Sequence, residues 1–432
     1  MYWFLFGLYN LLFIPLLNIA VHLAAPFSAK IAQGLQDRKD LFPQLQQNLS
    51  GLDNNKPRIW IHISSMGEFE QAKPVIALLK ERHPDWIVLL SFFSPSGYRP
   101  ARNYPLADLI TYLPLDSYRH ARRFVEQINP SIGLVIRHDI WLNSQHILHQ
   151  RGIPALLIDA SIADIRLSSY HRWRIFFRPF YRHFNRILTV SPENSRRFAE
   201  FLGSDKKVAS CGDTRYDQVV LRSQETERIQ SLTQLNWFEP RHCLIAGSTW
   251  PSDEQHILPV IEHWLARDPN NRCIIAPHET TAEHIADLRQ WAAKTDLNAV
   301  LFSAVVPESM EPPPRVLIID KVGLLANLYA LASLAFVGGS FGPGIHSVLE
   351  PAAHGCVLFW GPRYRNSVEA QMFVQQELGV SVANSRAAID WLDGNVDDWQ
   401  QRQALGKRIR QTITENTGAS NCIIKEIEKF IN

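Results

Sequence analysis

Charged side chains are missing from the start of this chain. No aspartate, glutamate, lysine or arginine precedes Lys30, whereas the whole sequence contains 44 lysines and arginines and 42 aspartates and glutamates. The net charge of +2 lacks the strong basic excess that is typical of nucleic-acid-binding proteins, so we expect no nucleic-acid partner. Hydrophobic residues make up 46% of the chain and charged residues 20%, which excludes a long disordered polymer.

Cysteine is also scarce. The five cysteines are widely separated and form no Cys-x-x-Cys or Cys/His pattern. Such an odd, dispersed set predicts neither a disulfide framework nor a zinc site, and it favours a reducing, cytosolic environment for the folded part of the chain. No Asp-x-Asp motif follows a predicted strand, so we expect no metal ion in the site.

The uncharged start forms a hydrophobic segment of 26 residues, which is long enough to span a bilayer as a helix. A cleaved signal peptide needs a basic beginning, which is missing here, and a buried core helix is the third alternative. We interpret residues 1–28 as a membrane anchor, spanning or partly embedded. Because positive flanks stay in the cytoplasm, Lys30, Arg38 and Lys39 predict that the rest of the chain lies on the cytoplasmic side.

The rest of the chain alternates short aliphatic runs with amphipathic helical stretches such as Gln71–Arg82. Continuous apolar runs are typical of strands buried on both faces of a parallel sheet. Two series of such strands, separated by a polar stretch at residues 221–240, predict an α/β protein with two Rossmann-like domains, 29–225 and 226–432, and a central cleft. The predicted strands are Arg58–Ser64, Ile87–Phe92, Ile132–Ile136, Ala155–Ile158, Arg186–Val190, Lys207–Ser210, His242–Gly247, Arg272–Ala276, Arg315–Ile319, Leu334–Gly338 and Cys356–Phe359.

Ligands of such sheets bind beyond the carboxyl ends of the strands, so the loops that follow strands hold the candidate site residues. The first of these loops is Ser64–Glu68, which places Glu68 in the first turn of a helix. The helix dipole favours an acid there for stability alone. A carboxylate at the mouth of the cleft can also act as a general base, and both interpretations stay open on these residues alone.

The loop from Val337 to Glu350 contains four glycines. It leads into a helix that we expect to begin near His346, where backbone N–H groups could approach an anion. Four residues after His346, Glu350 would face the same side of that helix and bind a ribose. A tight turn with an internally bonded glutamate is the alternative, and the spacing does not match the G-x-G-x-x-G dinucleotide fingerprint.

Three shorter loops also follow strands. Gly247–Trp250 combines a glycine with two hydroxyl side chains, as either a helix cap or a phosphate site would. Pro277–Glu279 ends another strand, and Gly212–Asp217 lies near the expected hinge between the domains. None is distinctive alone, but all are expected to converge on one cleft.

Residues 166–186 form an arginine-rich run with six arginines, two histidines, many aromatic residues and no acid. Basic and aromatic segments suit an anionic membrane surface or phosphates, and single-stranded RNA could use the same chemistry. Because the hydrophobic start belongs to the same domain, we favour a membrane or a phospholipid-like acceptor.

These residues together resemble a known family. The run IWIHISSMGEFEQAKPVI (residues 59–76) is similar to the opening signature of the 3-deoxy-D-manno-octulosonic acid (Kdo) transferases of lipopolysaccharide synthesis. Collinear similarity extends to about residue 375. The further matching segments are SPSGY (94–98), YLPLD (112–116), HDIWLN (138–143), GDTRYD (212–217), GSTWPSDE (247–254), APHE (276–279), FVGGSFGPGIHSVLEPAAHG (336–355) and GPRYRNSVEA (361–370).

The resemblance implies the GT-B architecture and transfer of Kdo from CMP-Kdo to a lipid A precursor, with inversion, at the cytoplasmic face of the inner membrane. It implies that Glu68 is the general base and that Asp139, close to Trp141, is a second catalytic carboxylate. No metal and no other cofactor are implied. The residues implied for the donor nucleotide are Ser248, Thr249, His278, Gly339, Ser340, Gly344, His346 and Glu350, with Arg215 near the hinge.

The sequence departs from the common family pattern at Arg137, at His278-Glu279, at Ser347 and at Ser367. These departures concern the nucleotide contacts and the acceptor rather than the class of reaction. Two alternatives are a nucleotide-sugar epimerase of the same architecture, which needs neither the anchor nor the arginine-rich run, and a non-catalytic membrane-bound binding protein.

Overall fold

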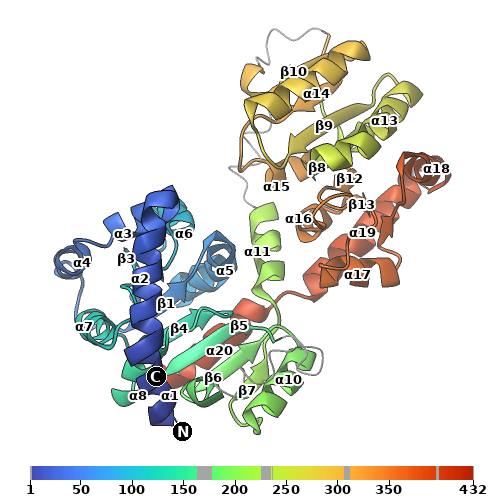
Figure 1. Cartoon of the computed structure of the whole chain (residues 1–432). Coiled ribbons are helices and arrows are strands. Elements are labelled where there is room, and N and C mark those ends of the chain that lie inside the picture. The colour runs from blue at the N-terminus through green and yellow to red at the C-terminus, as the bar shows by residue number, and fades with distance from the viewer. Residues whose placement is uncertain are drawn as a thin grey trace. The chain divides into compact units, whose positions relative to one another are not determined.

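The computed structural model describes residues 2–162, 178–224, 235, 237–305, 312–395 and 398–431. The chain divides into two compact units, Met1–Gln218 with Thr417–Asn432, and Val219–Asn416 (Figure 1). The second unit therefore begins before the predicted boundary at residue 226. The prediction that it extends to residue 432 is wrong, because helix α20 (Ala419–Ile431) buries its apolar face in the first unit.

Seven strands form the sheet of the first unit: β1 (Arg58–Ile63), β2 (Ile87–Phe92), β3 (Leu109–Tyr112), β4 (Ile132–Ile136), β5 (Ala155–Ala160), β6 (Arg186–Thr189) and β7 (Val208–Ser210). They are parallel and lie in the order β3-β2-β1-β4-β5-β6-β7. All residues of β1, β2, β4 and β5 are buried, which explains why their sequences are mostly apolar. Alternate β1 residues face opposite cores, with Trp60 in the cluster of Phe124 and Ile61 in the cluster of Val75.

The hydrophobic start forms a continuous helical segment, Tyr2–Phe27, which is long and apolar enough to cross a membrane by length and composition. It comprises α1 (Tyr2–Leu8), the π-helical turn η1 (Tyr9–Phe13), α2 (Ile14–Ala24) and the 3₁₀ turn η2 (Ala25–Phe27). The wider π turn precedes Pro15, whose ring has no N–H and crowds the carbonyl group four residues earlier. The other helices of the first unit are α3 (Ala29–Gln36), α4 (Leu41–Leu49), α5 (Met66–Arg82), α6 (Pro95–Ala101), α7 (Tyr118–Ile128), α8 (Leu142–Gln150) and α10 (Pro192–Leu202).

The sheet of the second unit also has seven parallel strands: β8 (Cys243–Thr249), β9 (Arg272–Pro277), β10 (Ala299–Leu301), β11 (Val316–Ile318), β12 (Leu334–Val337), β13 (Val357–Trp360) and β14 (Gly379–Ser381). Their order is β10-β11-β9-β8-β12-β13-β14. Helix α11 (Thr214–Ser223) begins in the first unit and ends in the second. The other helices are α13 (Pro251–Arg267), α14 (Ala282–Lys294), α15 (Leu325–Leu328), α16 (Leu349–Ala353), α17 (Val368–Gln375), α18 (Ser385–Asn395) and α19 (Trp399–Glu415).

One pair of cysteines contradicts the expectation that the cysteines stay unpaired. Cys211 and Cys422 form a disulfide bond, with their Cα atoms 5.4 Å apart, while Cys243, Cys273 and Cys356 are free and buried. This disulfide bond could not be predicted from the spacing of the cysteines, because 211 residues separate the two. They meet because α20 returns to the first unit. Figure 1 shows this red helix beside the sheet of the first unit.

Candidate active site

In each sheet the strand order reverses between two neighbouring strands, β1 and β4 in the first unit and β8 and β12 in the second. Open parallel sheets bind ligands at such a point, beyond the carboxyl ends of the strands. Glu68 follows β1 and Asp139 follows β4, whereas Ser248 lies at the end of β8 and the Gly-rich loop follows β12. The topology thus brings Glu68 and Asp139 to one place in the first sheet, and Ser248 and the Gly-rich loop to one place in the second.

Glu68 lies in the first turn of α5, as predicted, and is half-buried. The Ser65 hydroxyl donates a hydrogen bond to Glu68 Oε2. Phe69, the next residue, is buried against the Phe92 ring with the ring centroids 5.4 Å apart, which fixes the first turn of the helix. The carboxylate is therefore held by one oxygen at the end of β1.

Asp139 is held by a buried histidine that the sequence did not single out. His62 Nε2 lies 2.9 Å from Asp139 Oδ2, and His62 Nδ1 lies 3.0 Å from Ser91 Oγ. Trp60 Nε1 donates to the same serine oxygen at 2.8 Å. An ionised carboxylate can only accept, so His62 donates to Asp139 through Nε2. This chain of hydrogen bonds ties the Asp139 carboxylate to the buried ends of β1 and β2.

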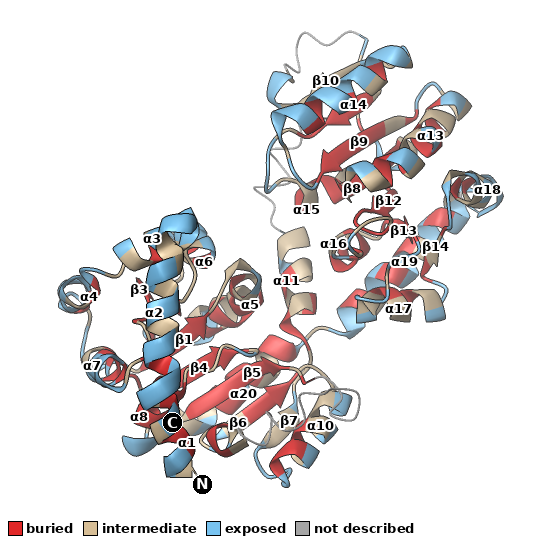
Figure 2. Ribbon diagram, in the orientation of Figure 1, coloured by how far each residue is buried: buried red, intermediate tan, exposed pale blue. Residues whose placement is uncertain are grey.

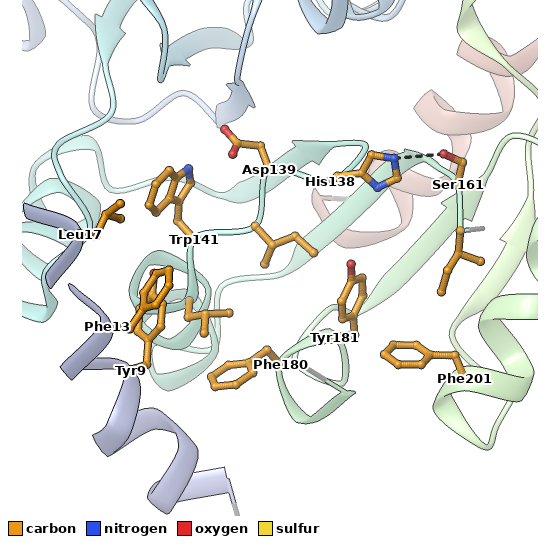
Figure 3. Close-up of a pocket in the computed structure, with 13 residues that line it drawn as sticks. Tyr9, Phe13, Leu17, His138, Asp139, Trp141, Ser161, Phe180, Tyr181 and Phe201 are labelled. Carbon is orange, nitrogen blue, oxygen red and sulfur yellow. Dashed lines mark hydrogen bonds between the residues drawn. The ribbon is translucent and has the colours of Figure 1, made fainter. Parts of the chain in front are cut away.

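A cavity of about 720 Å³ adjoins Asp139 (Figure 3). Its walls are mainly aromatic and aliphatic, and the N-terminal helix supplies Tyr9, Phe13 and Leu17. Tyr9 fixes that helix on the unit, because its hydroxyl donates to the buried Asp116 carboxylate at 2.7 Å. The other lining residues are His138, Ile140, Trp141, Leu142, Ser161, Ile162, Phe180, Tyr181 and Phe201.

Arg215 belongs to the first unit and is bound by its neighbour. Its guanidinium group donates to Asp213 through Nε at 3.0 Å and through a terminal nitrogen at 2.6 Å. Burial, followed by the nearby Asp213 charge, raises the pKa of Asp159 to about 7, although Thr214 donates two hydrogen bonds to it. Within the first unit, Arg215 thus completes a polar cluster at the start of α11.

The Gly-rich loop of the second unit closes around a carboxylate of its own chain. Asp253 Oδ2 accepts the backbone N–H of Gly339 at 2.8 Å and that of Trp250 at 2.9 Å, and Oδ1 accepts the N–H of Phe341 at 2.9 Å. The expectation that this loop offers its N–H groups to an anion is wrong for Gly339 and Phe341. Asp253 was missed, although an acid three residues after a cap position is the signal of a capping box.

The helix after this loop begins at Leu349 rather than near His346. His346 lies in the loop before this helix, so the inference that it shares a helical face with Glu350 is wrong. Glu350 lies in the first turn of α16 and faces Arg222, with 3.6 Å between the charged groups.

Three rings form a continuous stack in the second unit. The His278 ring lies 4.7 Å from the Trp250 ring and 4.3 Å from the His346 ring, and Trp250 Nε1 donates to His346 Nε2 at 3.0 Å. Burial, followed by the neighbouring His278, lowers the pKa of His346, so this ring is neutral near pH 7 and accepts the indole hydrogen bond. The stack presents the exposed His278 ring at the carboxyl end of β9.

The predicted hydroxyl groups differ in accessibility. Thr249 and Ser340 are fully buried, with Thr249 donating to Glu254 at 2.8 Å and Ser340 to the Val337 carbonyl group at 2.9 Å. Ser248 is partly exposed, with a positive φ of 54°. The remaining predicted loop residue, Gly344, has a φ of 136° that disfavours a side chain.

The described arginines of the arginine-rich run form hydrogen bonds and an ion pair within the first unit. Arg178 and Arg182 donate to the Leu202 carbonyl group, and Arg186 pairs with Glu426 at 3.0 Å. These three do not form a free cationic surface, and Arg166, Arg172 and Arg174 lie outside the described residues. Within the described ranges, no group of three or more His, Cys, Asp or Glu side chains could hold a metal ion.

One departure from the family pattern has a local role. Ser367 caps α17, because its hydroxyl accepts the backbone N–H of Ala370 at 3.1 Å. Arg137 adopts a positive φ of 61°, and its Nε atom is buried without a partner among the described residues. Nothing in the structure explains Ser347.

Solved structures with a similar fold include a UDP-GlcNAc 2-epimerase from Neisseria meningitidis, with a TM-score of 0.61 and 14% identity over 86% of this chain and all of that one. A glycosyltransferase from Rickettsia africae has a TM-score of 0.53 and 11% identity, covering 87% of this chain and 98% of that one. Identities this low show the fold alone, and the two Rossmann-like units confirm the predicted GT-B class.

The sequence comparisons are more specific. A family model described as 3-deoxy-D-manno-octulosonic-acid transferase (kdotransferase) matches residues 34–218. A 3-deoxy-D-manno-octulosonic acid transferase from Haemophilus influenzae is 26% identical over 86% of this chain and 87% of its own length, and one from Aquifex aeolicus is 25% identical over 80% and 86%. The family model spans the sheet that carries Glu68, His62 and Asp139, and the relatives extend the match into the second unit. Residues 34–218 thus match the Kdo transferase domain, and the similarity to named Kdo transferases over most of the chain supports a glycosyltransferase enzyme.

Proposed function

We propose that this protein transfers Kdo from CMP-Kdo to a sugar hydroxyl of a lipid A precursor, with inversion at the anomeric carbon. The main support is the pair of carboxylates, Glu68 and Asp139, at the point where the strand order of the first sheet reverses. The names of the matching relatives support the sugar, and the apolar cavity beside Asp139 supports a lipid-linked acceptor.

In this proposal Glu68 removes the proton of the acceptor hydroxyl as the new bond to Kdo forms. Ser65 orients the carboxylate, which leaves the second oxygen for the acceptor. Asp139, fixed by His62, accepts a hydrogen bond from the acceptor sugar. Positioning of this kind is a large part of catalysis. The two reactants lose their translational and rotational entropy when they bind, so this loss no longer adds to the barrier of the reaction.

CMP leaves as an anion, so the donor site must stabilise a phosphate. The Gly339 and Phe341 N–H groups are occupied by Asp253, and we assign this task to the partly exposed Ser248 hydroxyl and to the His278 side chain. His278 is the central, exposed ring of the stack, and a nucleobase could pack against this group of rings.

The decisive test replaces Glu68 by glutamine, which keeps the shape but not the basicity. Transfer from CMP-Kdo to a lipid A precursor, read by mass spectrometry, is expected to fall by about 10²-fold or more, while CMP binding by calorimetry is retained. Glu81→Gln is the matched control, because Glu81 is an exposed acid near the other end of the same helix. Full transfer by Glu68→Gln would contradict the assigned role.

The donor distinguishes the alternatives. CMP is expected to raise the melting temperature and UDP is not, whereas stabilisation by UDP would favour the epimerase whose fold this chain shares. An unchanged melting temperature with both nucleotides would favour a non-catalytic binding protein.

We also propose that the N-terminal helix lies in the plane of the cytoplasmic face of the inner membrane rather than across the membrane. Tyr9, in the first third of the helical segment, is hydrogen-bonded to buried Asp116, and Tyr2 at its start is bonded to His146, so the beginning of the helix is fixed to the folded unit. Sedimentation with phosphatidylglycerol vesicles tests the association, and release by alkaline carbonate is expected for a helix that does not span the bilayer.

A further inference from the structure

Two cavities adjoin beneath the N-terminal helix. The first, beside Asp139, measures about 720 Å³, and the second measures about 360 Å³. Leu17 and Trp141 line both cavities, so the two cavities are neighbours along the helix, and we treat them as two parts of one groove. The second cavity is otherwise lined by Ile14, Asn18, Val21, Lys30, Ile31, Gly34, Leu35, Arg38, Phe93, Ser94, Pro95, Leu115 and Asp116.

The groove has a polar end. Asp139 lies beside Trp141, and Figure 3 shows the indole nitrogen of Trp141 on the side of Asp139. This nitrogen is buried and has no acceptor among the described residues. A buried N–H group without a partner is costly, so a bound oxygen acceptor at this point would be stabilising.

The outer face of the same helix is apolar and open. Figure 2 shows α2 mostly in the colour of exposed residues. Water is a poor solvent for such a surface, and a bilayer is a good one. The exposed side chains are Trp3, Phe4, Leu8, Leu11, Leu12, Phe13, Leu16, Ile19, Leu23 and Phe27.

We propose that this groove binds one fatty acyl chain of the acceptor lipid, which enters from the membrane beside the helix. The amide or ester oxygen at the head of the chain accepts the Trp141 N–H, and the sugar to which the chain is attached then lies at Asp139. This inference rests on the proposed function and adds a chain-binding site to it.

The shape and the chemistry of the groove select this occupant. A second protein would cover the exposed outer face of the helix, whereas the groove runs beneath it and is lined mainly by apolar side chains. Arg38 is not available for a free anion, because it donates to the carbonyl groups of Gly34, Phe93 and Leu113. The groove thus favours a neutral chain with one polar head, next to a carboxylate that can bind a sugar hydroxyl.

The test measures binding without transfer. The probes are N-acyl glucosamines with acetyl, hexanoyl, octanoyl and decanoyl chains, used below their micelle concentrations and followed by calorimetry on the whole protein. The dissociation constant is expected to fall about fourfold per methylene until the groove is full.

Leu17→Trp fills the point shared by both cavities and is expected to abolish the gain from the longer chains. Leu16→Trp adds the same bulk to an exposed neighbouring position and is expected to keep the dependence on chain length. Equal affinity for all chains, or equal behaviour of the two variants, would overturn the inference. If Glu68→Gln keeps full transfer while the dependence on chain length holds, the catalytic proposal fails and the groove remains.

Discussion

The hydrogen bond between Tyr9 and Asp116 is the contact whose loss tests the docking of the N-terminal helix most directly. Asp116 is 4% exposed, and its Oδ2 atom accepts from Tyr9 at 2.7 Å and from the backbone N–H of Asn143 at 3.2 Å. Burial raises the pKa of Asp116 to about 6, and the hydrogen bonds from Tyr9 and Asn143 oppose this rise. The contact therefore has a strength that depends on pH.

Tyr9→Phe removes one donor and keeps the ring. At about pH 8, where Asp116 is ionised, the lost bond to a charged group is expected to cost about 1.5–3 kcal/mol of unfolding free energy. At about pH 5 the carboxyl group is protonated and the neutral bond is worth about 0.5–1.5 kcal/mol. A carboxyl group with a raised pKa binds its proton more tightly in the folded state, so its stabilising protonation is lost as the pH rises through about 6. The loss of unfolding free energy caused by Tyr9→Phe is expected to increase as the pH rises, because the ionised carboxylate accepts the stronger hydrogen bond.

The assay is urea unfolding at both pH values. Tyr118→Phe is the control, because the Tyr118 hydroxyl makes only a 3.3 Å contact with Gln150 at the surface, and its cost is expected to stay below about 0.5 kcal/mol. The Tyr9→Phe, Asp116→Asn double-mutant cycle isolates the coupling between the two side chains. A Tyr9→Phe cost that is the same at both pH values, or no larger than that of the control, would refute the reasoning.

Three further predictions concern the two units separately. His62→Ala removes the donor to Asp139 and is expected to lower transfer by about tenfold or more in steady-state kinetics, whereas His62→Gln, which keeps an N–H donor, is expected to recover part of the loss. Asp253→Ala leaves three backbone N–H groups without their acceptor, so urea unfolding of the second unit is expected to show a loss of about 3–5 kcal/mol. Gly339→Ala places a Cβ atom 2.2 Å from the Gly344 carbonyl oxygen at a φ of 81° and is expected to destabilise the protein by more than about 1 kcal/mol, whereas Gly394→Ala, with open space in a helix, is expected to stabilise it slightly.

The sequence predicted most of the central strands, because a strand buried on both faces has a continuous apolar run. It missed β3, β10 and β14, which lie at the edges of their sheets and contain only three or four residues. The loops after the strands were found by position, since parallel strands present their carboxyl ends at one side. This reasoning placed Glu68 after β1, whereas Asp139, which follows the neighbouring strand β4, was indicated only by the family resemblance.

The contacts within those loops could not be predicted in the same way. His62 and Asp139 are 77 residues apart, and Asp253 and Gly339 are 86 residues apart, so no local pattern joins them. A Gly-rich loop before a helix is typical of an anion site, but here a carboxylate of the same chain already occupies two of its N–H groups. The arginine-rich run was predicted to face a membrane or a phospholipid-like acceptor. Arg178 and Arg182 instead donate hydrogen bonds to a carbonyl group of their own unit, which no local pattern indicates.

The return of α20 to the first unit also determines when that unit can finish folding during synthesis. Ile423, Ile424 and Ile427 complete one of its hydrophobic cores, yet they leave the ribosome after all 198 residues of the second unit, Val219–Asn416. At about 5–20 residues per second, roughly 10–40 s pass between the two events. During this interval the second unit can already be folded while the sheet that carries Glu68 still exposes part of its apolar face. A chain that lost only its last helix would keep every candidate catalytic residue and still lack the core that supports them.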